Sequence, residues 1–419
     1  MKAITLVLFL SSIAFAAGTW VDTSFIAPSL GFENWLTVYL PEGYDPQGTI
    51  DYPVIYFLHA WTSHWYEGKA WHGNILNNMI SNGDIQPVIF VQPDGWCEPY
   101  YGCMWVNSEL YGNYEDYVSE DLIAFVDSTF RTIPQEDCRC IMGASMGGLG
   151  SMDVAFRNPE QYNAVASMAG LLDMMVELPL WVPLVLSESP QSSPPYTYAW
   201  GNGFYTDVLF AASGGYSPNL EAPDSVDFIL DENGNLIDSV YAHWEVHNPA
   251  HTAKELTPPI GLSIFFGYGS NDDIEGVIEA NESFADTLDV LGIDYELFVD
   301  DGGHATTVER MEAALMFCDS CMYGTGIEHG SSAQDICLQT HPNPFSMSSM
   351  LSFELSNAGH VRLDVYDVSG RIVENLADGE MASGPHTLEI DGSGLIPGVY
   401  MVRLQSGIQQ ETVMIVLVR

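Results

Sequence analysis

The stretch CIMGASMGGLGS, residues 140–151, decides how this chain folds. Its first residues form a short apolar run that is typical of a buried strand, and a helical run follows Ser145. Gly143, Gly147 and Gly148 surround this serine, and glycine lets a backbone bend sharply and lets other groups approach it closely. The stretch therefore predicts a strand, a tight turn with Ser145 at its apex, and a helix.

Short apolar runs and helical stretches alternate on both sides of this unit. The expected strands are residues 36–40, 54–58, 88–91, 260–266 and 295–299, and the expected helices are residues 71–81, 117–130, 275–291 and 305–317. Strand and helix alternation of this kind is typical of a mostly parallel sheet that is covered by helices. We therefore expect an α/β fold for the main part of the chain, residues 17–323.

The N-terminal residues 1–16 predict a secretory signal peptide. Lys2 precedes an apolar run at residues 4–10, and Ala14-Phe15-Ala16 supplies the small residues that a signal peptidase accepts. The apolar run is too short to span a bilayer, and no later stretch reaches that length. We expect a secreted, soluble mature protein.

Residues 174–256 break the alternation of strands and helices. They contain many prolines and aromatic residues, and this composition indicates a long segment that lies above the sheet, here called the insertion. Long insertions of this type often build a lid or an acyl pocket. A loop that only packs over an edge of the sheet is an equally good interpretation, and the sequence leaves both open.

The C-terminal residues 338–419 follow a Gly- and Ser-rich linker at residues 324–337 and have a different pattern. Inward and outward residues alternate at 351–355, 361–366, 386–390 and 399–404, and turns such as Ile396-Pro397-Gly398 separate these runs. The pattern predicts a small antiparallel β-sandwich as a separate domain.

The charge balance excludes some classes of partner. The chain has 11 Lys and Arg against 56 Asp and Glu, a formal net charge of -45. Nucleic acid binding requires clustered cations, so nucleic acid is not expected as a partner, and anionic membranes are disfavoured. Adaptation to salty surroundings and descent from a lineage with acidic secreted proteins explain the imbalance equally well.

The seven cysteines stand at 97, 103, 138, 140, 318, 321 and 337. In an exported protein, disulfides are the first interpretation, and an odd number leaves one cysteine unpaired. Cys97 and Cys103 bracket a turn-rich segment that is able to close a small disulfide loop. Zinc binding by the two Cys pairs at 138/140 and 318/321 is the alternative. Disulfides are favoured, and no cofactor or metal is expected.

Ser145 is the candidate nucleophile, and a serine hydroxyl needs a base that a carboxylate orients. When a nucleophilic serine lies on such a turn, the acid and then the histidine follow it in the chain. His304 fits best as the base, because it directly follows an expected strand and precedes a helix. Asp272 is the preferred acid over Asp273. The alternative role for either aspartate is to cap the helix that begins near Glu275.

Backbone amides are the expected donors to a developing oxyanion. The N–H of Met146 follows the nucleophile directly, and the N–H groups of Ala60 or Trp61 lie after the expected strand at 54–58. His59 precedes Ser145 in the chain, and we interpret it as a structural hydrogen-bonding residue and not as the base.

Residues 35–318 resemble the esterase D family, which includes feruloyl and acetyl-xylan esterases, S-formylglutathione hydrolase and mycolyltransferases. The segments that carry the resemblance are Leu40-Pro41-Glu42-Gly43-Tyr44, Phe57-Leu58-His59-Ala60-Trp61, Gln92-Pro93-Asp94-Gly95, Trp105-Val106-Asn107-Ser108, Tyr114-Glu115-Asp116-Tyr117 and Gly143-Ala144-Ser145-Met146-Gly147-Gly148. The chain departs from the family at His59-Ala60, where the family has His-Gly. The resemblance implies an α/β-hydrolase fold and a catalytic triad of Ser145, Asp272 and His304.

The function that this resemblance implies is a secreted serine carboxylesterase that acts through an acyl-enzyme. Its expected substrates are acetyl or feruloyl groups linked to carbohydrate. An acyltransferase with the same triad and a surface-binding protein on an inactive hydrolase scaffold are the alternatives.

The C-terminal domain is similar to the type A sorting domains of the type IX secretion system and to the immunoglobulin-like module of the flagellar hook-capping protein. The similarity is carried by Pro342-Asn343-Pro344-Phe345, Tyr366-Asp367-Val368-Ser369-Gly370-Arg371 and Pro397-Gly398-Val399-Tyr400. It implies an immunoglobulin-like sandwich, the outer-membrane secretion machinery as a partner, and a secreted or cell-surface protein. A passive accessory β-domain is the alternative.

Overall fold

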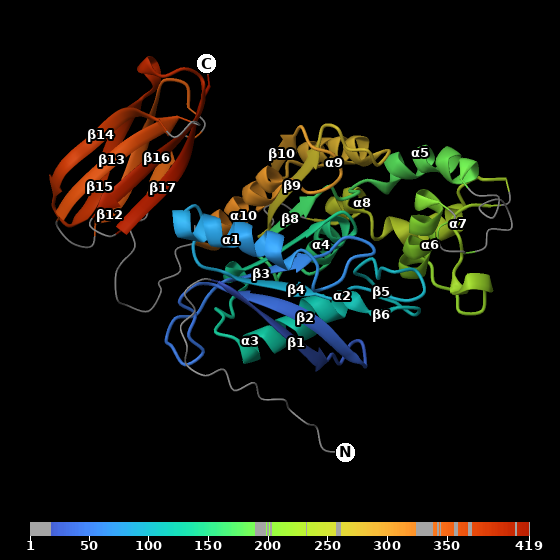
Figure 1. Cartoon of the computed structure of the whole chain (residues 1–419). Coiled ribbons are helices and arrows are strands. Elements are labelled where there is room, and N and C mark those ends of the chain that lie inside the picture. The colour runs from blue at the N-terminus through green and yellow to red at the C-terminus, as the bar shows by residue number, and fades with distance from the viewer. Residues whose placement is uncertain are drawn as a thin grey trace. The chain divides into compact units, whose positions relative to one another are not determined.

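The structure, a computed structural model, divides into two compact units, Met1–Thr325 and Gly326–Arg419 (Figure 1). It describes residues 18–188, 198, 201, 203–231, 233–256, 261–323, 338–341, 343, 345–355, 359–367, 371–406 and 409–418. The predicted signal peptide at residues 1–16 and the predicted linker at residues 324–337 lie outside the described residues.

The first unit is built on an eight-stranded sheet with the order β1-β2-β4-β3-β7-β8-β9-β10. The strands are β1 (Thr19–Ile26), β2 (Glu33–Leu40), β3 (Val54–Leu58), β4 (Ile89–Pro93), β7 (Arg139–Ala144), β8 (Ala164–Met168), β9 (Ser263–Gly269) and β10 (Glu296–Asp300). From β4 to β10 all neighbours pair in parallel, while β1 and β2 pair antiparallel at one edge. The expected mostly parallel sheet is confirmed.

Helices cover both faces of this sheet, and alternate strand residues divide between the two layers. On β3, Ile55 and Phe57 join one core cluster with α1 (Lys69–Asn82) and α10 (Val308–Tyr323). Val54, Tyr56 and Leu58 join the other cluster with α3 (Leu122–Thr129), α4 (Met146–Arg157) and α9 (Val277–Leu291). Burial of this apolar surface is the main force that holds the layers together.

The insertion contains four α-helices among its described residues. They are α5 (Met174–Ser187), α6 (Phe204–Tyr216), α7 (Asp238–Glu245) and α8 (Pro249–Thr252). Trp181 on α5 and Trp244 on α7 are nearly fully buried and join the main core cluster. Two of the prolines are accommodated within a helix, since Pro179 and Pro183 both lie in α5.

The helix expected at residues 117–130 is divided in the structure. α2 (Tyr114–Asp116) leads into a π-helical turn at Tyr117–Asp121, and α3 follows directly. Wider turns of this type are often inserted into otherwise regular helices. Tyr117 and Val118 within the turn are fully buried, so the π-helical turn packs against the core.

The second unit contains two antiparallel sheets, β11-β12-β15 and β14-β13-β16-β17. The strands are β11 (Gln339–His341), β12 (Ser348–Leu355), β13 (Gly359–Asp367), β14 (Ile372–Met381), β15 (Gly384–Asp391), β16 (Gly398–Ser406) and β17 (Gln409–Leu417). Alternate apolar residues of both sheets, among them Leu351, Leu363 and Val402, form one core. The predicted all-β sandwich is confirmed.

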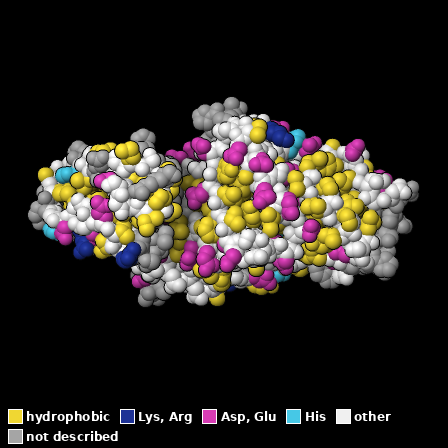
Figure 2. All heavy atoms as spheres, turned by 90° about the horizontal axis from the view of Figure 1, so that it is seen from above, with side chains coloured by type: hydrophobic (Ala, Val, Ile, Leu, Met, Phe, Trp, Pro, Cys, Tyr) yellow, Lys and Arg dark blue, Asp and Glu magenta, His cyan; other side chains and the backbone are white. Residues whose placement is uncertain are grey.

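The surface reflects the acidic composition. In Figure 2, Asp and Glu side chains are scattered over the visible face, where few Lys or Arg side chains appear. Among the described residues, no helix is both long enough and apolar enough to cross a membrane.

The described cysteines are free thiols in the structure. Cys97 and Cys103 are both buried, and burial, followed by a side-chain hydrogen bond between the two thiols, raises the pKa of the Cys103 thiol. The predicted disulfide between them is therefore not formed here, although the two side chains are neighbours. Cys337 lies outside the described residues.

One buried ion pair fixes the loop between β10 and α10. The Arg310 guanidinium is fully buried, and its Nε donates to Oδ2 of Asp300 at 2.8 Å while Nη2 donates to Oδ1 at 3.0 Å. Nη2 also donates to the Gly303 carbonyl oxygen at 3.2 Å. Burial raises the pKa of Asp300, but hydrogen bonds from Arg310 and Gly302 outweigh it, and the net pKa is lowered.

We predict that Arg310→Met destabilises the first unit by about 3 to 5 kcal/mol, because it leaves the Asp300 carboxylate buried without its partner. Because the folded pKa of Asp300 lies below its unfolded value, the stabilisation is present above about pH 4 and is lost as the pH falls through the folded pKa. Urea unfolding at several pH values measures both effects.

Arg131→Met is the control, since Arg131 pairs with Asp51 in an exposed ion pair and should cost less than about 1 kcal/mol. Equal losses in the two variants would contradict the role given to the buried pair.

Candidate active site

Ser145 lies at the sharp turn between β7 and α4. β7 ends at Ala144 and α4 begins at Met146, and Ser145 between them has φ 54° and ψ -117°. Such a conformation is unfavourable for a residue with a side chain, and surrounding contacts must hold it. The predicted strand, turn and helix are all present.

The glycines of this turn are required by close backbone contacts. A Cβ atom on Gly147 would lie 1.9 Å from the Leu58 carbonyl oxygen, and one on Gly143 would lie 2.1 Å from the Gly147 carbonyl oxygen. No side chain fits at these distances, so α4 packs directly against the end of β3. This contact places Ser145 between the ends of two neighbouring strands.

The structure brings the three predicted triad residues into one hydrogen-bonded chain. Nε2 of His304 lies 2.9 Å from Oγ of Ser145. Nδ1 of the same ring lies 3.1 Å from each carboxylate oxygen of Asp272. The Asp272 side chain is completely buried and the His304 side chain is 21% exposed, so the arrangement is accessible only at its serine and histidine end.

Asp272 and Asp273 have different environments. Asp272 faces the histidine ring, and its Oδ1 also accepts the N–H of Ile274 at 3.0 Å. Asp273 is exposed, and its Oδ1 lies 3.4 Å from the backbone N of His304. Neither caps the following helix, because α9 begins at Val277 and its N-cap residue is Gly276.

The residues predicted as oxyanion donors lie around Ser145. Ala60, Trp61 and Met146 all line the cavity into which Ser145 opens. Met146 is the first residue of α4, where backbone N–H groups have no partner within the helix. The Trp61 ring is fixed by its Nε1, which donates to the Tyr100 carbonyl oxygen at 2.8 Å.

His59 has a structural position, as expected. It is 2% exposed, and its Nδ1 lies 2.8 Å from the Ala60 carbonyl oxygen. A carbonyl oxygen only accepts, so Nδ1 carries the proton and Nε2 is left to accept the Gly95 N–H at 2.8 Å. His59 thus ties the loop after β3 to the loop after β4.

A cavity of about 410 Å³ opens beside Ser145 and His304. Half of its lining residues come from the insertion and most are apolar. They are Ala60, Trp61, Thr62, Met104, Ser145, Met146, Leu149, Leu171, Met174, Glu177, Leu178, Trp181, Phe204, Val208, Leu209, Ala212, Tyr216, Trp244, Ile274 and His304. The size and apolar lining are typical of a pocket for a small organic ligand.

Glu177 is a cavity residue that the sequence analysis missed. It lies on α5, is 4% exposed, and its Oε2 has no hydrogen-bond partner. Burial, and secondarily the nearby Asp173, raise the pKa of Glu177 well above its usual range. The only sequence signal is that Glu177 is the single charged residue in the apolar run 174–186.

The described part of the chain contains no group of three His, Cys, Asp or Glu side chains that is placed to hold a metal ion. A serine hydroxyl beside an imidazole, which a buried carboxylate holds in one orientation, is suited to proton transfer and nucleophilic attack.

Comparison with known proteins finds related esterases. The chain is 30% identical over 161 residues to an endo-1,4-beta-xylanase/feruloyl esterase of Xylanibacter ruminicola, a match that covers 36% of this chain and 22% of the relative. It is 26% identical over 149 residues to Esterase Rv1288 of Mycobacterium tuberculosis, covering 35% of this chain and 31% of that protein. The matched region thus spans less than a third of either relative.

A solved ferulic acid esterase has the same fold. It aligns with 73% of this chain and 99% of its own, with a TM-score of 0.51 and 18% identity. This likeness bears on the α/β-hydrolase architecture alone.

Family models match both units of the chain. Residues 339–418 match the secretion system C-terminal sorting domain, which indicates a secreted or cell-surface protein. Residues 27–307 match the Esterase family model. Since this second match covers more than half of the 419 residues, the chain belongs to the esterase family.

Proposed function

We propose that the protein hydrolyses carboxylic esters, with Ser145 as nucleophile, His304 as general base and Asp272 as the acid that orients it. The observation that carries the proposal is the continuous hydrogen-bonded chain from Ser145 Oγ through both ring nitrogens of His304 to a buried carboxylate. Membership of the esterase family supports the same reaction.

The reaction proceeds in two steps. Ser145 Oγ attacks the ester carbonyl carbon while His304 Nε2 accepts the hydroxyl proton, and the alcohol leaves with that proton as the acyl-enzyme forms. Water then attacks the acyl-enzyme, gives a proton to His304, and releases the carboxylic acid as Ser145 regains its proton. Asp272 stabilises the imidazolium in both steps.

The negative charge on the former carbonyl oxygen requires donors close to Ser145. The backbone N–H groups of Met146 and of Ala60 or Trp61 are the proposed donors, because these residues border the cavity beside the nucleophile. The triad and these amides are contributed by segments that follow β3, β7, β9 and β10, all of which are parallel.

An aromatic acyl group fits the cavity better than an acetyl group. An acetyl group would leave most of the 410 Å³ unfilled, whereas the walls offer Trp61, Trp181 and Phe204 to a flat ring. The matched relative that is named a feruloyl esterase agrees with this choice. Feruloyl-type esters linked to carbohydrate are therefore the proposed substrates.

We also propose that the chain is organised as predicted, with a signal peptide at 1–16, the esterase domain at 17–323, a linker at 324–337 and the sorting domain at 338–419. The sorting domain would direct the esterase through the outer-membrane secretion machinery. The two compact units and the separate family matches support this organisation.

Ser145→Ala is expected to lower kcat by roughly 10⁴ to 10⁶-fold while leaving thermal unfolding unchanged, because it removes one oxygen from a turn that the glycines shape. Steady-state hydrolysis of p-nitrophenyl acetate and methyl ferulate measures the loss, and a fluorophosphonate label should modify the parent protein only. A rate within tenfold of the parent would refute Ser145 as nucleophile.

Asp272→Asn is expected to lower kcat by about 10⁴-fold, because an amide does not hold the histidine in the required tautomer. Asp273→Asn is the matched control and should cost less than tenfold, since Asp273 faces only the backbone of His304. The same ester assays compare the two variants. A larger loss at position 273 would show that the acid is assigned one residue too early.

A chain that ends at Tyr323 is expected to keep its esterase activity and unfolding temperature, because Ser145, Asp272 and His304 all precede the linker. In the native host it should no longer reach the medium or the cell surface. Fractionation of the host culture and ester assays test these two statements. An inactive truncated chain would mean that the second unit completes the esterase.

The full-length exported protein should also contain a Cys97–Cys103 disulfide, although both thiols are free in the structure, since export exposes thiols to oxidising conditions. Mass spectrometry without reductant tests this statement.

A further inference from the structure

Glu177 is a buried carboxyl group that the proposed reaction does not use. It is more than nine-tenths buried in a mostly apolar lining, and its Oε2 has no hydrogen-bond partner. A buried polar group without a partner is destabilising, because it has lost its hydrogen bonds to water. Buried polar groups are usually satisfied, so an unsatisfied one in a ligand cavity points to a partner that the ligand brings.

The neighbouring indole donors are already engaged. Nε1 of Trp181 donates to the Glu275 carbonyl oxygen at 2.7 Å, and Nε1 of Trp244 donates to Oγ of Ser217 at 3.0 Å. These two tryptophans line the cavity but do not donate to Glu177. The two hydrogen bonds hold the indole rings in place, and the Glu177 carboxyl group faces the cavity.

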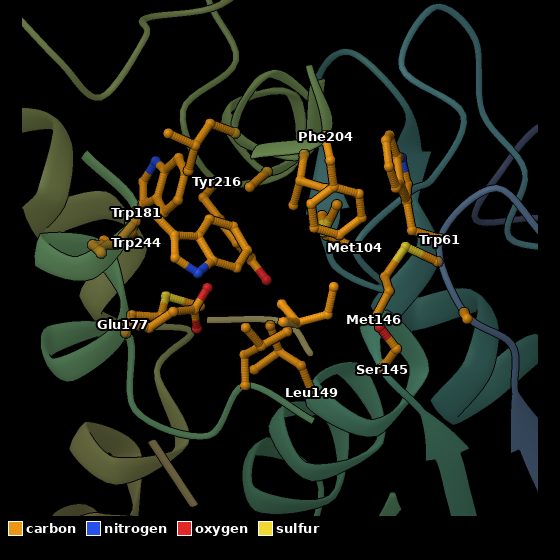
Figure 3. Close-up of a pocket in the computed structure, with 18 of the residues that line it drawn as sticks. Trp61, Met104, Ser145, Met146, Leu149, Glu177, Trp181, Phe204, Tyr216 and Trp244 are labelled. Atoms are coloured by element: carbon orange, nitrogen blue, oxygen red, sulfur yellow. The ribbon is translucent and has the colours of Figure 1, made fainter. Parts of the chain in front are cut away.

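Glu177 and Ser145 lie on opposite sides of the cavity. Figure 3 shows the Glu177 carboxyl on one side and Ser145 on the other, with Leu149 between them in this view and the Tyr216 hydroxyl near the carboxyl. An acyl group with its carbonyl carbon at Ser145 therefore crosses an apolar region before its far end reaches Glu177. A ligand that fills this space needs an apolar middle and a polar far end.

We propose that Glu177 selects acyl groups that carry a hydroxyl group at the end opposite their carbonyl, and in particular the phenolic hydroxyl of 4-hydroxycinnamoyl groups. The proposal rests on the ester hydrolysis inferred above. A carboxyl oxygen accepts the phenolic O–H, and the flat ring contacts the apolar and aromatic walls. An ester without the hydroxyl offers the carboxyl group no partner, and a 4-methoxy group can only accept a hydrogen bond, so it leaves the accepting oxygen of Glu177 unsatisfied.

The test is a ratio of kcat/KM values for three methyl esters, the 4-hydroxycinnamate, the cinnamate and the 4-methoxycinnamate. A site that hydrogen-bonds a substrate hydroxyl strongly rejects analogues that lack it, so the parent should prefer the 4-hydroxy ester by about tenfold or more. In Glu177→Leu this preference should fall to about one, because the acceptor is gone. Glu177→Gln retains an amide oxygen and should keep part of the preference.

Glu279→Gln is the matched control, because Glu279 is an exposed residue of α9 that does not line the cavity. It should leave the ratio unchanged. Thermal unfolding verifies that each variant is folded, and if Glu177→Leu fails to fold, the parent ratios and the Gln variant decide. A structural role for Glu177 would lower all three rates together and leave their ratio at the parent value.

The outcomes separate this inference from the proposed function. A parent enzyme that cleaves p-nitrophenyl acetate through Ser145 but shows a ratio near one, or a Glu177→Leu variant that keeps the preference, overturns the inference and leaves the esterase assignment standing. Hydrolysis that persists in Ser145→Ala overturns both.

Discussion

The close approach of α4 to the end of β3 is the contact on which the site depends. At Gly147 the helix backbone lies against the Leu58 carbonyl oxygen, and no other residue has a side chain small enough for that distance. The contact forces the chain to turn at Ser145 into an unfavourable conformation, which the surrounding sheet stabilises. With the serine held there, the loops after β9 and β10 need only supply a carboxylate and an imidazole at the same edge of the sheet.

The parallel sheet explains why residues so distant in sequence meet. The carboxyl ends of parallel strands lie at one edge, and loops at that edge commonly build binding sites in α/β folds. Asp272 and His304 lie shortly after β9 and β10, which pair in parallel. Arg310 then fixes the loop between β10 and α10. It binds both the Asp300 carboxylate at the end of β10 and the Gly303 carbonyl oxygen next to His304.

The sequence predicted the parts of the fold whose signals are local. Continuous apolar runs such as residues 54–58 become central strands because both of their faces are buried. β8 was not predicted, since its sequence, AVASM, has little of the β-branched content that marks a strand, and β14 was missed because acidic residues interrupt its alternation. Glu177 could not have been predicted as a cavity residue, because its position in the cavity wall depends on how the helices of the insertion pack around it. The candidate triad was predictable because chain order and strand ends constrain it strongly.

The triad residues and the insertion occupy different parts of the sequence, and this separation has an evolutionary consequence. The triad positions 145, 272 and 304 all lie outside residues 174–256, while half of the cavity wall lies inside them. Substitutions in this one contiguous stretch can therefore reshape what the cavity admits without disturbing the groups proposed to break the ester bond. The residues proposed for catalysis and half of the residues that shape the cavity thus lie in separate parts of the sequence. Substrate selectivity is therefore able to change in evolution through residues 174–256 while the catalytic residues are retained.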